Sequence, residues 1–159
     1  IQVAWMDTVT STKAQQPWPW ADTQAVARLT AQDGTIDLVV LSGTSGKTLA
    51  FGPGHMAGTA EPGHFGNVVL SGHRDTHFAF LKSLGIGDKI NLQASDGNTK
   101  VYEVFGAEVV HQNDVAVAMD AGDDRITLIT CYPFDALIPG GPMRYVVVAK
   151  IISAQYLKI

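Results

Sequence analysis

Cys131 is the only cysteine in this 159-residue chain and the first candidate for a nucleophile. The five residues before it, Ile126 to Thr130, are β-branched or leucine, which is typical of a strand buried on both faces. The next segment, Tyr132 to Pro142, contains three prolines and two glycines and is therefore predicted to be a loop between antiparallel strands. Such a loop would return Arg144 to the neighbourhood of Cys131. A nearby guanidinium favours the thiolate, which is the reactive form of the thiol.

His73 is the candidate acid or base. It follows the apolar run Asn67 to Ser71, and the intervening Gly72 permits close approach of the backbone at the end of this predicted strand. An imidazole exchanges protons near neutral pH, so His73 beside the thiol would supply the proton carrier that a thiol nucleophile needs. The sequence therefore predicts a catalytic group made of His73, Cys131 and Arg144.

Two other interpretations stay open at this point. Cys131 could be a small buried apolar residue, as most free cysteines are. His73 and His77 are four residues apart and could bind zinc, with Cys131 or His111 as a third ligand. The helical metalloprotease pattern, however, requires a glutamate directly after its first histidine, and Arg74 stands at that position. We expect no required metal and no cofactor.

The composition limits the class of protein. Apolar residues make up 46% and charged residues 16% of the chain, with 16 glycines and 7 prolines, a balance typical of a strand-and-turn protein. The net charge of −4 and the lack of a lysine or arginine cluster leave no surface for neutralising phosphates, which argues against nucleic-acid binding. No apolar run approaches the roughly 20 residues that a membrane span needs. The chain begins with Ile1, so we expect an N-terminal piece to precede it.

Short apolar runs separated by turn residues predict a mainly β fold with a closed or nearly closed barrel. Asp96, Gly97 and Asn98 predict a hairpin between two of the runs. The predicted strands are Ala25 to Leu29, Ile36 to Leu41, Val68 to Ser71, Lys89 to Gln93, Val101 to Val110, Ile126 to Cys131 and Tyr145 to Ile152.

Helix is expected only in short pieces. Apolar residues at helical spacing predict one helix within Ile1 to Gln16 and another over Phe78 to Leu84. The segment Pro17 to Trp20 ends the first helix, and its two tryptophans are expected to pack onto the domain.

Three motifs together resemble the sortases, cysteine transpeptidases of bacterial cell surfaces. They are Ser71-Gly72-His73-Arg74, the run Thr127 to Cys131, and Arg144 thirteen residues after the cysteine. The resemblance covers about residues 21 to 152. It implies a closed eight-stranded β-barrel as the catalytic domain over residues 21–159, preceded by a helix and a Pro/Trp linker over residues 1–20.

The resemblance also implies a place in the cell. Sortases are anchored to the cytoplasmic membrane on its outer side, so an N-terminal anchor is expected outside this chain, and the protein is expected to be a monomer. The stretches Pro17 to Trp20, Phe51 to His55 and Gly72 to Phe78 are most similar to sortases of Gram-negative, often marine, proteobacteria. That subtype would place the domain in the periplasm.

The chemistry implied by the resemblance begins with attack by Cys131 on the carbonyl after threonine in a C-terminal sorting signal, Leu-Pro-x-Thr-Gly or the same with a final alanine. His73 would protonate the departing amine, Arg144 would bind the substrate and the developing oxyanion, and an amine acceptor would resolve the acyl-enzyme. The neighbours of the nucleophile, Thr130 and Tyr132, are expected to contact the substrate.

Some points stay open within this resemblance. Some sortases bind calcium beside the loop that precedes the cysteine strand, and the corresponding loop, His111 to Asp124, carries four aspartates. Acidic loop residues are more often simply solvated, so we expect no required metal here. A cysteine peptidase that resolves the acyl-enzyme with water is the alternative enzyme, and a surface binding module with an inactive site is the alternative from another class.

Overall fold

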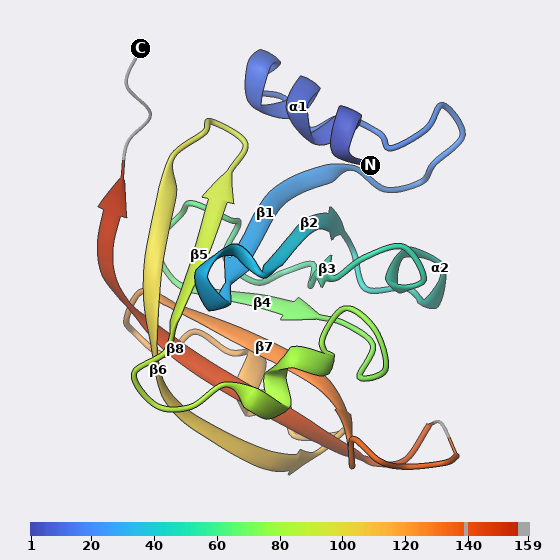
Figure 1. Ribbon diagram of the computed structural model, residues 1–159, viewed down its shortest axis with the longest axis vertical. Helices are drawn as coiled ribbons and strands as arrows, with labels where there is room; N and C mark the ends of the chain where they lie inside the picture. The colour runs from blue at the N-terminus through green and yellow to red at the C-terminus, as the bar shows by residue number, and fades with distance from the viewer. Residues whose placement is uncertain (139, 156–159) are drawn as a thin grey trace.

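The computed structural model describes residues 1–138 and 140–155, and eight of its strands close into a barrel (Figure 1). Their order around the barrel is β1-β2-β3-β4-β7-β8-β6-β5. The predicted mainly β class with a closed eight-stranded barrel is therefore confirmed. Pro139 and residues 156–159 belong to the expected catalytic region but lie outside the described residues. The strands are β1 (Ala25–Ala31), β2 (Ile36–Ser42), β3 (Gly54–His55), β4 (Asn67–Ser71), β5 (Lys89–Ala94), β6 (Thr99–His111), β7 (Arg125–Tyr132) and β8 (Met143–Gln155).

The two-residue strand β3 lies outside every predicted strand. A run of two residues has no periodicity, so the sequence gives no sign of a strand there. β3 pairs in parallel with β2 and antiparallel with β4, and so joins the two halves of the barrel. Gly54 permits this pairing, since a Cβ at that position would lie 2.0 Å from the carbonyl oxygen of Gly43.

The barrel interior is the main hydrophobic core. Alternate residues of neighbouring strands fill it, as Ile126 and Leu128 of β7 do. The 3₁₀ helix η2 (Ala79–Ser83) also contributes to it, with Phe78, Leu81 and Leu84 all buried. The predicted helical segment over Phe78 to Leu84 is therefore confirmed in position, as a 3₁₀ helix. The predicted hairpin over Asp96 to Asn98 is also present, between β5 and β6.

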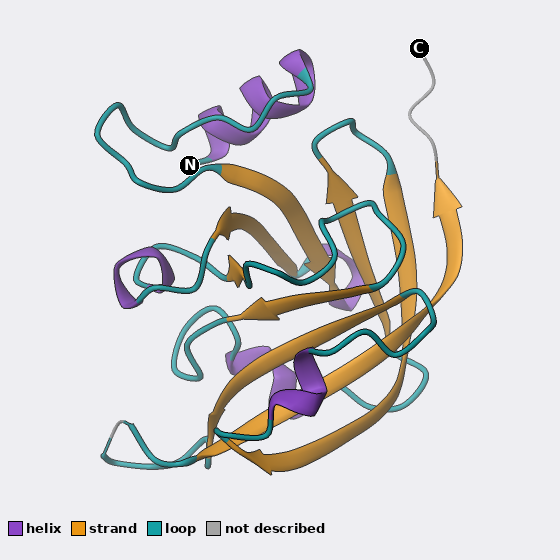
Figure 2. Ribbon diagram, turned by 180° about the vertical axis from the view of Figure 1, so that it is seen from behind, coloured by secondary structure: helices purple, strands orange, loops and turns teal. Residues whose placement is uncertain are grey.

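Helices are short and lie outside the strands (Figure 2). Besides η2 they are α1 (Gln2–Ser11), η1 (Gln32–Gly34), α2 (Gly46–Leu49) and η3 (Val115–Ala118). Among the described residues, none of these helices is long and apolar enough to cross a membrane.

The predicted N-terminal helix is confirmed as α1, which packs on β1 and β2. Trp5 is buried in a second hydrophobic cluster with Leu41 and other small apolar residues. The hydroxyl of Thr8 donates a hydrogen bond to the carbonyl of Ala25 at 3.2 Å, which fixes the helix to the start of β1.

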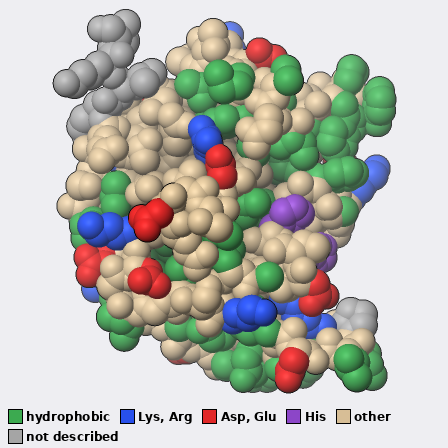
Figure 3. All heavy atoms as spheres, in the orientation of Figure 1, with side chains coloured by type: hydrophobic (Ala, Val, Ile, Leu, Met, Phe, Trp, Pro, Cys, Tyr) green, Lys and Arg blue, Asp and Glu red, His purple; other side chains and the backbone are tan. Residues whose placement is uncertain are grey.

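The Pro/Trp segment packs only in part. The ring of Trp18 meets that of Phe51 edge-on, with the centroids 4.7 Å apart. Trp20 is 83% exposed, so the prediction that both tryptophans pack is wrong for Trp20. The Ala21 N–H donates to the Trp18 carbonyl at 3.1 Å and closes a turn that contains Trp20. Apolar side chains consequently gather on the surface over the α1–β1 connection and α2 (Figure 3).

Candidate active site

The predicted nucleophile and the predicted cation face each other across two strands. β7 and β8 run antiparallel, and Cys131 is the register partner of Arg144. Register partners project to the same face of a sheet. Leu128 of β7 points into the barrel core, so Cys131, three residues further on, projects from the outer face together with Arg144. The thiol is half-buried there. The predicted return of Arg144 to the neighbourhood of Cys131 is therefore confirmed.

His73 follows β4, the strand that neighbours β7 on the side opposite β8. The two strands are parallel, with Ser71 beside Ile129, and the Gly72 N–H donates to the Ile129 carbonyl at 3.1 Å. His73 lies two residues past Ser71, as Cys131 lies two residues past Ile129. The parallel register therefore places the end of β4 beside Ile129, and His73 enters the turn that directly follows β4. The ends of β4 and β7 and the start of β8 thus deliver the three predicted residues to one edge of the barrel (Figure 1).

A tight turn holds His73 at this edge. Gly72 lies against the ring of the buried Phe78, and a Cβ at Gly72 would come within 2.7 Å of that ring. The Phe78 N–H donates to the His73 carbonyl at 3.0 Å and closes the turn. On the other side, the hydroxyl of Thr130 donates to the Gly72 carbonyl at 2.7 Å. The backbone on which His73 stands is therefore fixed by both β7 and the core.

The guanidinium of Arg144 lies over the loop that precedes it. Nη1 donates to the carbonyls of Gly141 and Met143 at 2.7 and 2.8 Å. Nη2 donates to Oε1 of Gln112, at the end of β6, at 3.1 Å. The sequence prediction missed Gln112, which belongs to no motif. Only the register of β6 against β8, which pairs His111 with Met143, brings it to this site.

Thr130 and Tyr132, the expected substrate contacts, project to the other face of β7. The side chain of Thr130 is 2% exposed and its hydroxyl is already bonded to Gly72. Tyr132 stacks on Tyr145, with ring centroids 6.1 Å apart, and Phe134 packs edge-on against both rings. The structure therefore does not bring these two side chains together with His73, Cys131 and Arg144.

Comparison with known proteins gives a family for this arrangement. A family model described as the sortase domain matches residues 29–152, which span β1 to β8. The chain belongs to the sortase family. It is 32% identical to sortase D of Bacillus subtilis over 118 residues, and 30% identical to sortase A of Bacillus anthracis over 139 residues. These alignments cover 74% and 85% of the chain but 59% and 63% of the two relatives, so the chain spans about three fifths of their length.

The fold comparison agrees. The structure of the sortase D5 transpeptidase of Clostridium perfringens superposes with a TM-score of 0.69 at 27% identity. The superposition covers 81% of this chain and 79% of that one. The sortase resemblance drawn from three short motifs is therefore confirmed over most of the barrel.

A second histidine of this sortase, His77, lies close to the site. Burial lowers the pKa of His77, and the neighbouring charge of His73 lowers it further. The zinc interpretation of His73 and His77 needs at least one more ligand. Across residues 1–138 and 140–155, no group of three or more histidine, cysteine, aspartate or glutamate side chains is placed to hold a metal ion.

The aspartates before the cysteine strand are engaged in other interactions. Asp114 and Asp120 accept hydrogen bonds from backbone N–H groups two residues further on. Asp123 pairs with Arg125 at 2.6 Å, and Asp124 pairs with Lys100 at 2.7 Å. These contacts shape the loop that precedes β7.

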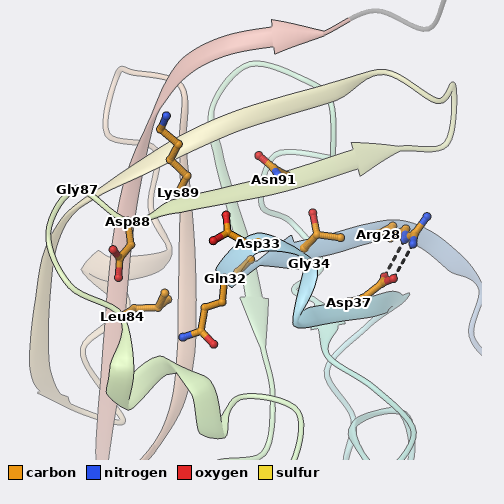
Figure 4. A pocket seen from close by; sticks show the side chains of 12 residues that line it. Arg28, Gln32, Asp33, Gly34, Asp37, Leu84, Gly87, Asp88, Lys89 and Asn91 are labelled. Carbon is orange, nitrogen blue, oxygen red and sulfur yellow. Dashed lines mark hydrogen bonds and ion pairs between the residues drawn. The ribbon is translucent and has the colours of Figure 1, made fainter.

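A polar cavity of about 620 Å³ lies elsewhere on the barrel, between β1, η1 and β5 (Figure 4). The Arg28–Asp37 pair stands at its rim, with hydrogen bonds of 2.7 and 2.5 Å. Its lining includes neither a thiol nor a histidine, so this cavity offers no alternative nucleophile.

Proposed function

We propose that this protein is a cysteine transpeptidase that cleaves a C-terminal sorting signal of the Leu-Pro-x-Thr-[Gly/Ala] kind after threonine. It transfers the acyl group to an amine acceptor at the cell surface. The observation that carries the proposal is the direct pairing of Cys131 with Arg144 across β7 and β8, with His73 in the turn directly after the parallel neighbour β4. A thiol, an imidazole and a permanent cation on one edge are the groups that acyl transfer through a thioester requires.

In the first half of the reaction the Cys131 thiolate attacks the carbonyl carbon of threonine and forms a tetrahedral oxyanion. Collapse of this intermediate breaks the C–N bond to the following residue and leaves a thioester on Cys131. His73 gives a proton to the departing amine. In the second half an acceptor amine attacks the thioester, loses a proton to His73 and releases the thiolate.

Arg144 has N–H donors that are not used within the described part of the protein and can bind this oxyanion. An arginine carries five N–H donors in a rigid fork. Its three hydrogen bonds to Gly141, Met143 and Gln112 use both hydrogens of Nη1 and one of Nη2. In the part of the chain that the structure describes, the Nε–H and the second Nη2–H make no hydrogen bond. We assign these two donors to the substrate, and the other three to orientation of the fork.

Thr130 and Tyr132 have a different role in this proposal from the expected contact with substrate. Thr130 holds the Gly72 carbonyl and thereby the backbone of His73. Tyr132 packs with Tyr145 and Phe134 beneath the start of the β7–β8 loop. Both side chains therefore position the catalytic residues from the inner side of β7.

The test is mass spectrometry of the protein after incubation with a Leu-Pro-x-Thr-Gly peptide. The expected result is an acyl adduct on Cys131 with the mass of the peptide up to threonine. Adding hydroxylamine or a glycine peptide separates transpeptidase from peptidase, because a thioester that accepts amines yields hydroxamate or amide in place of free acid. Failure of amines to enter the product at high concentration favours the peptidase. Absence of any adduct favours a binding module.

The cellular setting belongs to the same proposal. Sortases work at the bacterial cell surface, so we propose that this domain lies outside the cytoplasm. It would be held to the cytoplasmic membrane by an N-terminal anchor outside this chain and act as a monomer. The protein partners are the sorting-signal substrate and an amine-bearing surface component.

A further inference from the structure

Arg74, the residue directly after His73, has a role that the proposed chemistry leaves unassigned. Its side chain is only 6% exposed, whereas His73 beside it is exposed. A buried guanidinium normally has a carboxylate partner, because removing a charge from water is costly. The nearest carboxylate is that of Asp75, 3.8 Å from Nε on a side chain that is itself 74% exposed. Charge neutralisation therefore does not explain the burial of Arg74.

The hydrogen bonds of Arg74 join two loops of the active site. Its Nη2 donates to the carbonyl of Ile138 at 3.2 Å, in the loop that connects Cys131 to Arg144. Arg74 itself belongs to the turn that carries His73. One side chain thus links the histidine turn after β4 to the β7–β8 loop, and these two segments flank the thiol.

The middle of the β7–β8 loop has few other attachments. Phe134 packs at its start against Tyr132 and Tyr145. Beyond it the side chains of Leu137 and Ile138 are 99% and 80% exposed, so they anchor nothing. Within the described residues, the bond from Arg74 is the hydrogen bond that ties positions 134–138 to another element.

The attachment has one donor left over. Nη1 of Arg74 is buried and has no hydrogen-bond partner among the described residues. A buried donor without an acceptor is costly, and it is satisfied when an acceptor comes within reach. Burial of Arg74 therefore carries a cost that its bond to Ile138 offsets only in part.

We propose that Arg74 is a positioning residue that fastens the β7–β8 loop to the His73 turn and so holds these two segments in place for the peptide. This inference rests on the proposed function for the identity of the peptide. The attachment of the loop in the free protein is independent of that function.

The experiment compares Arg74→Met and Arg74→Lys with the unmodified chain, and uses Arg28→Met as a matched arginine variant away from the site. Hydrogen exchange of residues 134–138 and steady-state cleavage of a Leu-Pro-x-Thr-Gly peptide are measured on each. For Arg74→Met we expect loop exchange and KM each to rise about tenfold, the factor that corresponds to loss of one hydrogen bond to a charged group. We expect kcat to change less than KM.

Several outcomes would overturn the inference. One is a folded Arg74→Met variant with unchanged loop exchange and KM. Another is exchange that rises evenly over the whole barrel, which marks a purely structural residue. If Arg74→Met does not fold, Arg74→Lys decides, because it keeps the charge but ends one bond short of Nη2, the atom that donates to Ile138. Loop exchange and KM equal to the unmodified chain would then reject the attachment. Absence of an acyl adduct in the unmodified protein would count against the proposed function alone, and loop exchange in the free protein would still decide the role of Arg74.

Discussion

Cys131 and Arg144 are direct register partners in the antiparallel pair of β7 and β8. Their separation is therefore set by the strand ladder and not by flexible side chains alone. A shift of this register by one residue would move one of the two side chains into the barrel.

Cys131→Ala is expected to abolish cleavage of a sorting-signal peptide, because no other thiol is present to form the acyl-enzyme. The fold should persist, since the thiol is only half-buried and the change is small. Peptide cleavage and thermal unfolding measure the two effects. Cleavage of the peptide by a folded Cys131→Ala variant would exclude Cys131 as the nucleophile.

The two histidines of the turn form a matched pair. His73→Ala should be nearly as severe as loss of the thiol, because the departing amine would lose its proton donor. His77→Ala should be much milder, since His77 lies four residues further along the turn. Rates of single-turnover cleavage compare them. Equal losses at both positions would revive the zinc interpretation.

Arg144→Lys should reduce kcat/KM by about 100-fold or more, by analogy with removal of one oxyanion donor. A lysine ammonium cannot hold Gly141, Met143 and Gln112 while still presenting a donor to the substrate. Gln112→Ala keeps the guanidinium but removes one of its acceptors, and it should give a smaller loss. A lysine variant with near-normal activity would place Arg144 outside the reacting centre.

Thr130→Val separates the two roles considered for Thr130. The change keeps the shape of the side chain but leaves the buried Gly72 carbonyl without its partner, so the free energy of unfolding should fall by about 1–3 kcal/mol. Activity should fall with it, because the His73 backbone loosens. A higher KM at unchanged stability would instead favour direct contact with the substrate. Urea unfolding and kinetics on the same preparation measure both quantities.

Stability should depend on pH through His77. Its pKa in the folded protein is lowered below the ordinary 6.5, chiefly by burial, so the unfolded chain binds a proton more readily. Stability from this residue is therefore fully present above about pH 6.5 and is lost as the pH falls through the lowered pKa. Urea midpoints measured across this range should fall less steeply on acidification in His77→Gln. Identical slopes in both proteins would contradict the assignment.

The local features of the sequence determined much of this protein. Runs of β-branched residues predicted most of the strands, and apolar spacing predicted the helical segments. The prolines and glycines after Cys131 predicted the loop that brings Arg144 back to it. These signals are reliable because each depends on residues close together in the chain. The motifs around His73, Cys131 and Arg144 were enough to indicate the sortase family. The Gram-negative subtype stays a prediction.

Only the tertiary structure decided how these pieces meet. The two-residue strand β3 forms because it pairs with β2 on one side and β4 on the other. Two residues are too few to show a strand periodicity in the sequence. The approach of the His73 turn to β7 depends on the parallel register of β4 and β7, whose paired residues lie 58 positions apart in sequence. The inward face of Thr130 and Tyr132, the burial of Arg74 and the contact from Gln112 likewise depend on long-range pairing. A side chain's neighbours across a barrel are set by strand register, which a single sequence does not specify.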